Sequence, residues 1–173
     1  YYSVGELTDG SQWMGEGARQ LGLDGRVETA TFAEVLAGRL PDGSVLDAQR
    51  GEHRPGLDLT FSAPKALSLL AILGKDERII DVFRQSVAAT LSWAEKNLAE
   101  ARVWDRQAKR QVVEQASNLV AAAFLHDVNR NGDPQLHVHV VLANATFASD
   151  GRWHALRNDE LYRAQHLLGA IHN

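Results

Sequence analysis

The stretch LHVHVVLANATF, residues 136–147, decides the fold. Successive side chains on a β-strand point to opposite faces, so His137 and His139 would share one face and the valines between and after them the other. A second β-rich run, NLVAAAFLHDV, occupies residues 118–128, and residues 129–134 between the two runs are strong turn formers. The two runs therefore predict an antiparallel hairpin.

A third histidine, His126, lies on the first run, where the hairpin brings it opposite the region of His137 and His139. For all three to share a face, His126 must pair with an odd-numbered residue. This requires an even number of residues in the loop or a β-bulge. Three imidazoles from two strands favour a metal site with open positions for a substrate oxygen. The alternative is a set of hydrogen-bonded core histidines. Gln135 and Asp127 are candidates to orient the rings.

The composition is that of one globular domain, with 173 residues of which 45% are hydrophobic. The chain has no cysteine, which excludes disulfides, thiolate metal sites and cysteine nucleophiles. We recognise no signal peptide and no apolar run long enough to span a bilayer in these 173 residues, so we expect no membrane insertion. The net charge of −4 argues against a DNA-binding domain, so any DNA contact must come from local basic clusters.

Periodicity and turn residues predict the remaining elements. Residues 1–28 and 40–56 are expected to be irregular. Further strands are expected over residues 57–61 and from Gly151, and residues 102–116 predict an exposed hairpin or loop. Ser62 is the expected N-cap of a helix with Pro64 in its first turn. The expected helices run from Thr29 or Thr31 to Gly38, and over residues 63–73, 76–101 and 158–171.

Together these elements predict an α/β (α+β) fold with a central antiparallel sheet. The histidine hairpin and the strand 57–61 would lie in the middle of this sheet. Helices 63–73 and 76–101 would pack on one face, and the opposite face would hold the metal. We expect one domain over residues 1–173, truncated from a longer protein, because the chain begins without Met and ends within an expected helix.

Asp58 is a second candidate functional residue, because it lies on the polar face of the strand 57–61 shortly before a helix N-terminus. Such a terminus offers backbone donors and a positive dipole end to an anion. Lys65 adds a positive charge in the first turn of that helix. The three features predict a phosphate-binding corner. The alternative is a solvated carboxylate.

Three long motifs resemble those of MobF-type conjugative relaxases, which belong to the HUH endonuclease superfamily. They are WMGEGARQLGLDG at residues 13–25, HRPGLDLTFSAPK at residues 53–65, and LVAAAFLHDVNR with DPQLHVHVVLAN within residues 119–144. The resemblance extends along nearly the whole chain. It implies an HUH endonuclease-like fold that nicks single-stranded DNA at a plasmid transfer origin. The reaction is a transesterification through a 5′-phosphotyrosine intermediate, which also permits strand transfer.

The resemblance also assigns roles to the candidate residues. His126, His137 and His139 would hold one divalent metal ion, Mg, Mn or Zn, which polarises the scissile phosphate. Asp58 would orient a histidine and act as base or hydrogen-bond acceptor toward the attacking phenol.

The nucleophile is expected to be a tyrosine near the N-terminus. Relaxases of this family carry two tyrosine pairs there, and Tyr1 and Tyr2 are the candidates in this chain. They lie 12 and 11 residues before Trp13, a spacing that resembles the second pair of the family. In that case the primary nucleophile precedes residue 1. Tyr162, in the last expected helix, is interpreted as a packing residue.

DNA contact is expected from basic side chains, because cations with an interleaved aromatic side chain suit single-stranded DNA. Near the hairpin this aromatic side chain is Trp104; the alternative is a solvated hairpin. The expected DNA-binding residues are Arg54, Lys65, Arg102, Arg106 and Arg110.

The expected partners are single-stranded transfer-origin DNA, other relaxosome proteins and a helicase domain of the full-length protein, in the cytoplasm. Two alternative functions stay open. One is an origin-binding fragment that does not nick, and the other is an unrelated three-histidine metalloenzyme.

Overall fold

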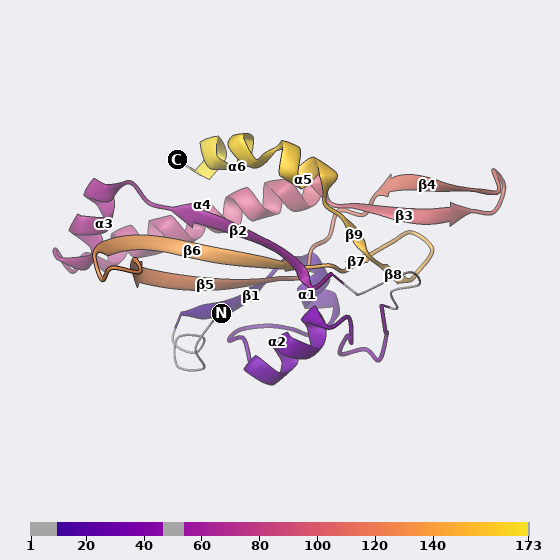
Figure 1. Cartoon of the computed structure of the whole chain (residues 1–173), viewed down its shortest axis with the longest axis horizontal. Coiled ribbons are helices and arrows are strands. Elements are labelled where there is room, and N and C mark those ends of the chain that lie inside the picture. The colour runs from indigo at the N-terminus through magenta and orange to yellow at the C-terminus, as the bar shows by residue number, and fades with distance from the viewer. Residues whose placement is uncertain (1–9, 47–53, 173) are drawn as a thin grey trace.

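The computed structural model describes residues 10–46 and 54–172. Its centre is a four-stranded sheet in the order β1-β5-β6-β2, and every pair is antiparallel (Figure 1). The strands are β1 (Ser11–Met14), β2 (Gly56–Ser62), β5 (Ala121–Val128) and β6 (Pro134–Ala143). The histidine hairpin β5–β6 occupies the middle of the sheet, as expected. Within the described residues the Asp58 strand, β2, is an edge strand, whereas the sequence had placed it in the middle.

The register of the hairpin puts all three histidines on one face. His126 lies opposite His137, and Phe124 lies opposite His139. His126 thus pairs with an odd-numbered residue, and the register shifts only after it, between His126 and Val128. On the other side of β6, Thr60 lies opposite His139 and Ser62 opposite His137. The face shared by the histidines therefore also carries the even-numbered residues of β2, including Asp58.

One face of the sheet is covered by helices. Their apolar side chains pack against the odd-numbered residues of β2 and the even-numbered residues of β6, which point to this face. Phe83, Val87 and Leu91 of the long helix lie in one buried cluster with Phe61 and Val138. Burial of each large side chain stabilises the fold by about 1.5–3 kcal/mol. The helices on this face are α3 (Lys65–Ile72), α4 (Glu77–Leu98), α5 (Asp159–Arg163) and α6 (Gln165–His172). This arrangement confirms the expected helical layer.

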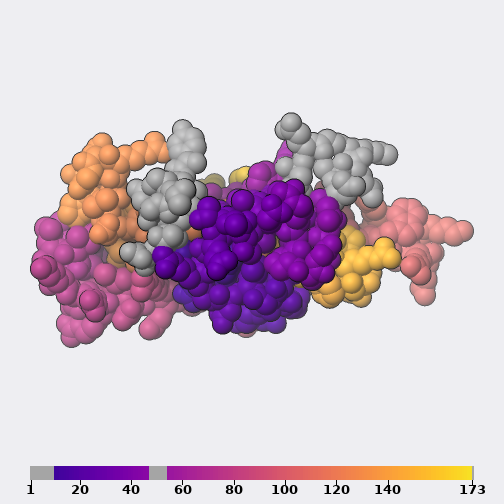
Figure 2. Space-filling model, turned by 90° about the horizontal axis from the view of Figure 1, so that it is seen from below, coloured from indigo at the N-terminus to yellow at the C-terminus, as the bar shows by residue number. Residues whose placement is uncertain are grey.

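The opposite face is covered in part by two further helices, α1 (Glu16–Gln20) and α2 (Thr29–Leu36). Trp13, Phe32 and Phe124 form its aromatic core, with edge-to-face contacts at ring separations of 6.2 and 5.3 Å. Seen from this side, α1 and α2 lie over the middle of the molecule, while the β5–β6 turn stands clear of them at one end (Figure 2). The histidine end of the sheet is therefore not covered by these helices.

The prediction of irregular structure for residues 1–28 is wrong for β1 and α1. β1 has only four residues and lies between Gly10 and Gly15, so its sequence carries no alternation long enough to read. Gly15 has φ 95°, and a Cβ atom there would lie 2.2 Å from the carbonyl oxygen of Leu119. This close approach is open only to glycine. What looks in the sequence like a loop glycine is the point where β1 turns tightly against β5.

Two expected boundaries are also corrected. Ser62 is the last residue of β2 and not a helix cap, and the N-cap of α3 is Pro64, without a side-chain hydrogen bond. The expected C-terminal helix is divided at Ala164 into α5 and α6.

The expected third strand from Gly151 is divided in two, and neither part joins the central sheet. One part pairs with a short strand, β7, and the other with β3 of the hairpin described below. The short strands are β7 (Thr146–Phe147), β8 (Trp153–His154) and β9 (Leu156–Arg157).

The basic segment over residues 102–116 forms the expected hairpin, from β3 (Glu100–Asp105) and β4 (Arg110–Gln115). It projects from the end of the molecule opposite the β5–β6 turn (Figure 1). Within residues 10–46 and 54–172, no helix combines the length and the apolar character needed to cross a membrane.

Candidate metal and catalytic site

The three histidines lie close together near the turn that joins β5 and β6. Their ring centroids lie 5.1 Å (His126–His137), 5.4 Å (His126–His139) and 5.2 Å (His137–His139) apart. Three imidazoles bound to one tetrahedral ion through bonds of about 2.1 Å would have their ring centres roughly 5 Å apart. The spacing of the rings thus fits a single metal ion.

The orientation of the rings fits less closely than their spacing. The rings of His126 and His137 are nearly parallel, at 20°, while His139 stands edge-on to both, at 88° and 75°. Among the described residues no group of three or more His, Cys, Asp or Glu side chains is in a ready coordination geometry. The stacked pair would have to turn about its side-chain torsions for the donor atoms to meet at one point.

The tautomer of His139 is set by its neighbours on β2. Its Nδ1 lies 3.0 and 3.2 Å from the two carboxylate oxygens of Asp58, and 3.1 Å from Oγ1 of Thr60. An ionised carboxylate only accepts hydrogen bonds, so Nδ1 carries the proton and donates a hydrogen bond to Asp58. Nε2 of His139 is then left with its lone pair, which is the form in which a histidine binds a metal.

His137 is held in the same way by the main chain. Its Nδ1 donates to the carbonyl oxygen of Gln135 at 2.9 Å, which again leaves Nε2 with its lone pair. The expected role of Gln135 in orienting a ring is thus carried by its backbone and not by its side chain. Asp127, the other candidate, is exposed and makes no hydrogen bond to a histidine within the described part of the chain. Nε2 of His126 is shielded from solvent.

Thr60 is a residue of this site that the sequence did not reveal. It is one of the polar positions of β2, and only its pairing opposite His139 brings its hydroxyl to the ring. The register of two strands separated by some 79 positions in the chain decides this contact. A local pattern carries no such signal.

The expected phosphate-binding corner is not assembled as a unit. Asp58 is engaged with His139, while Nζ of Lys65 donates to the carbonyl oxygen of Pro134 at 2.8 Å. That contact ties the start of α3 to the β5–β6 turn. Asp58 lies four positions before the end of β2, which is about 13 Å along the strand. Asp58 therefore belongs with the histidines, and Lys65 with the turn beyond them.

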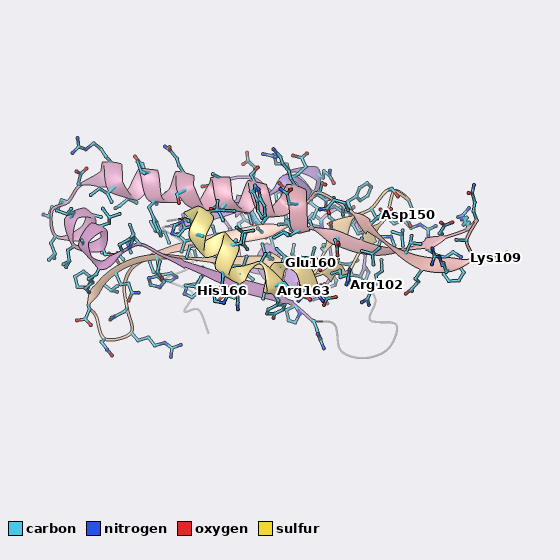
Figure 3. All side chains as sticks on the ribbon, turned by 90° about the horizontal axis from the view of Figure 1, so that it is seen from above. Arg102, Lys109, Asp150, Glu160, Arg163 and His166 are labelled. Atoms are coloured by element: carbon cyan, nitrogen blue, oxygen red, sulfur yellow. The ribbon has the colours of Figure 1, made fainter. Side chains whose placement is uncertain are left out.

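The remaining expected DNA-binding residues lie far from the histidines. Arg102 and its neighbours Arg106 and Arg110 belong to the β3–β4 hairpin, and Figure 3 shows Arg102 and Lys109 at the opposite end of the molecule from the β5–β6 turn. Arg54 lies just before β2, at the strand end remote from Ser62. The structure brings only Lys65 of this set near the metal site. The expected nucleophiles, Tyr1 and Tyr2, lie outside the described residues.

The sequence of the whole chain, residues 1–173, matches the family model of the TrwC relaxase. The chain belongs to the TrwC relaxase family. It is 45% identical, over 164 residues, to the multifunctional conjugation protein TraI of Escherichia coli, an alignment that covers 93% of this chain and 9% of TraI. This membership argues against an unrelated three-histidine metalloenzyme.

Solved structures of conjugative relaxase TrwC have the same fold. A metal-bound structure of TrwC in complex with oriT DNA superposes with a TM-score of 0.90 at 42% identity, over 99% of this chain and 60% of that chain. A TrwC complex with a 27-mer DNA comprising the recognition hairpin and the cleavage site superposes with a TM-score of 0.88 at 43% identity, over 94% of this chain and 58% of that chain. The likeness supports the expected HUH endonuclease-like architecture. The chain spans under two thirds of these TrwC chains and under a tenth of TraI.

Proposed function

We propose that this chain is part of the catalytic domain of a conjugative relaxase, which nicks single-stranded DNA at a transfer origin and transfers the strand by transesterification. The observation that best supports this proposal is the group of three histidines on one sheet face, with Asp58 hydrogen-bonded to one of them. Its likeness to TrwC, whose structures include a metal-bound complex with oriT DNA, supports the same substrate class.

His126, His137 and His139 are the proposed ligands of the divalent metal. In His137 and His139, Nδ1 is engaged by a main-chain carbonyl or by Asp58, so Nε2 is the nitrogen that would bind the metal. An ion bound there would act as a Lewis acid toward a phosphate oxygen and stabilise the charge that develops on it. The all-imidazole donor set accepts Mg, Mn or Zn among other ions, with imidazole best suited to the transition metals.

Cleavage of the DNA strand requires one nucleophile and one proton acceptor. A tyrosine oxygen forms a bond to the scissile phosphorus, the bond from phosphorus to the 3′ oxygen breaks, and that oxygen takes a proton to leave as a 3′ hydroxyl. The phosphate remains on the tyrosine as a 5′ phosphodiester, so the reverse reaction rejoins DNA without an external energy source. Tyr1 or Tyr2, or a tyrosine that precedes them, is the proposed nucleophile.

Asp58 is the proposed proton acceptor toward the phenol, and it also orients His139. Its side chain is 43% exposed, so a substrate group can reach it while it holds the ring. Thr60 contacts the same nitrogen of His139 and supports the orientation. The two roles of Asp58 are compatible because a carboxylate has two oxygens, each of which accepts more than one hydrogen bond.

The surroundings of the reaction follow from this assignment. Lys65 and Arg54, with Arg102, Arg106 and Arg110 of the hairpin, are proposed contacts to the DNA backbone. We infer that residues 1–173 form one domain of a longer protein that works with other relaxosome proteins and a helicase domain. We propose that it works in the cytoplasm, because the proposed substrate is plasmid DNA.

The test is the formation of a covalent protein–DNA adduct. The protein, and a version extended at its N-terminus, is incubated with labelled single-stranded origin DNA and Mn or Mg, and the adduct is resolved by denaturing electrophoresis. We expect an adduct in at least the extended version, and its loss in His137→Ala. An adduct in the extended version alone would place the primary nucleophile before residue 1.

A second candidate function is recognition of the origin without nicking. Both versions would then bind origin DNA and form no adduct. An adduct that persists in His137→Ala would contradict the metal assignment.

A further inference from the structure

A hollow of about 350 Å³ lies at the end of the sheet remote from the histidines. It is bounded by the start of β2, the end of β6, β9 and α5, the helix marked by Glu160 and Arg163 in Figure 3. Leu57, Leu142 and Leu156 form apolar parts of its wall. The volume lies in the lower range of natural ligand pockets, which suits one small planar group better than a large ligand.

The polar side chains of the hollow have no task in the fold that the structure shows. Arg54, Asn144, Asn158 and Tyr162 line it, and none of their side chains makes a hydrogen bond or ion pair with another described residue. Asn158 stands at the N-cap of α5 without a side-chain cap bond. Tyr162 is 55% exposed although it is aromatic. A guanidinium, two carboxamides and a phenol ring therefore surround one space, and their side chains form no hydrogen bond or ion pair among residues 10–46 and 54–172.

One carboxylate, that of Asp159, lies at the rim of the hollow. Asp159 accepts a hydrogen bond from Nε of Arg157 at 2.9 Å, and this ion pair offsets its charge in part. Arg157 is itself bonded to Glu100 at 2.8 Å, so these three residues form their own network beside the hollow. Arg54 is left as the cation that faces a ligand.

We propose that this hollow binds one nucleotide of the DNA strand, with the base stacked on Tyr162 and a flanking phosphate on Arg54. Aromatic rings accept any base by stacking, guanidinium groups bind phosphate, and carboxamides bind base edges that are unpaired in single-stranded nucleic acid. Asn144 and Asn158 give the subsite a preference among bases. This inference rests on the proposed function, since it takes single-stranded DNA as the ligand.

The position of the hollow agrees with one strand reaching both places. Arg54 lies four residues before Asp58, which is about 13 Å of extended chain. Leu57 and Leu142 of the hollow lie on the helix-covered face and the histidines on the other face, so a DNA strand that reaches both places must cross β2, the edge strand of the described sheet.

The test compares affinities for single-stranded DNA that spans the nick site, measured by fluorescence anisotropy. Tyr162→Ala should weaken binding roughly five- to a hundred-fold, the range of one lost stacking contact. Tyr162→Phe keeps the ring and should bind within about two-fold of the parent. Arg84→Ala, an exposed arginine of α4, is the control for the loss of one positive charge in Arg54→Ala. Since Tyr162 is largely exposed, its truncation leaves the fold intact.

Base preference and cross-linking locate the nucleotide. With 5-iodouracil placed at successive positions of the DNA, Tyr162 should cross-link from one position or two adjacent ones. Base changes at that position should alter the affinity of the parent, and should alter it much less in Asn144→Ala with Asn158→Ala combined. Parent-like affinity in Tyr162→Ala and in the combined asparagine variant would overturn the subsite, as would a parent that binds no single-stranded DNA.

Adduct formation by the same proteins separates this inference from the proposed function. An adduct with Tyr162-independent binding would refute the subsite and leave the nicking activity standing. Tyr162-dependent binding without any adduct, in the N-terminally extended version as well, would support the subsite and refute nicking.

Discussion

At the scale of single residues, the site depends on which nitrogen of each histidine carries the proton. Asp58 and Thr60 meet Nδ1 of His139, and the Gln135 carbonyl meets Nδ1 of His137. The spacing of the three histidines in the sequence predicts that they meet. It does not predict Thr60 or the Gln135 carbonyl, because both contacts depend on strand register and main-chain direction.

Asp58→Asn should weaken metal binding about ten- to a hundred-fold, the usual effect of losing an outer hydrogen-bond partner of a ligand. The amide keeps the shape but removes the charge that stabilises the Nδ1 proton. Isothermal titration of the purified variant with Mn measures the effect. Asp150→Asn is the matched control. Asp150 also bonds to a histidine, His154, at 3.0 Å, but this pair lies outside the metal site. Parent-like affinity in Asp58→Asn would show that this contact does not tune the metal.

At the scale of elements, long periodic segments were predictable and short ones were not. The alternation over β5 and β6 and the apolar stripe of α4 extend over enough residues to fix their type. β1 has four residues and the division of α5 from α6 falls at one alanine, so neither leaves a periodic signal. Tertiary contacts set these boundaries, as the close approach of Gly15 to Leu119 illustrates.

Gly15→Ala should lower the free energy of unfolding by about 1–3 kcal/mol or more, because φ is positive and the added Cβ would meet the Leu119 carbonyl at 2.2 Å. Gly22→Ala is the control, since Gly22 also has positive φ but no atom near a built Cβ. Urea denaturation followed by circular dichroism compares the two. An equal loss in both variants would mean that the contact with the Leu119 carbonyl adds nothing to the backbone strain.

The seam between α4 and α6 should weaken in acid. Burial lowers the pKa of His172 below its ordinary value of 6.5, and the ring lies against Phe61 and Phe83 with Nδ1 at 2.7 Å from Ser86. The unfolded chain therefore binds the proton more readily than the folded one. This contribution to stability is complete above about pH 6.5 and is lost as the pH falls toward the folded pKa.

His172→Gln should remove this pH dependence, because the amide does not titrate. Urea midpoints measured at about pH 5 and about pH 7.5 give the difference for parent and variant. The parent should lose more stability between these pH values than the variant does. Equal losses in the two proteins would assign the acid sensitivity to other groups.

At the scale of the whole molecule, the β3–β4 hairpin and the β5–β6 turn stand at opposite ends of an elongated body (Figure 1), and the histidines belong to the two strands that this turn joins. The sequence identified the cluster of Arg102, Arg106 and Arg110 but not its distance from the metal site, since no local pattern encodes how far an arm projects. A net charge of −4 is compatible with DNA binding in such a molecule, because the arm carries a local cluster of cations, Arg102, Arg106, Lys109 and Arg110.

Replacing Arg102, Arg106 and Arg110 together by alanine should lower the salt dependence of DNA binding. Each lost phosphate contact reduces the slope of log K against log salt by about 0.7 for single-stranded DNA, so the slope should fall by roughly 2. At saturating DNA the rate of adduct formation should stay near that of the parent, because the arm lies far from the histidines. An unchanged slope would show that the hairpin is a solvated arm without DNA contact.

The proposed function depends most directly on one metal ion held by three histidines. Mn binding to the parent and to His126→Ala, His137→Ala and His139→Ala, with His154→Ala as the control histidine outside the site, measures this. We predict one ion per chain for the parent and for His154→Ala, and loss of that ion in each of the three site variants. Retention of the ion at parent affinity in any one of the three would contradict the three-histidine centre.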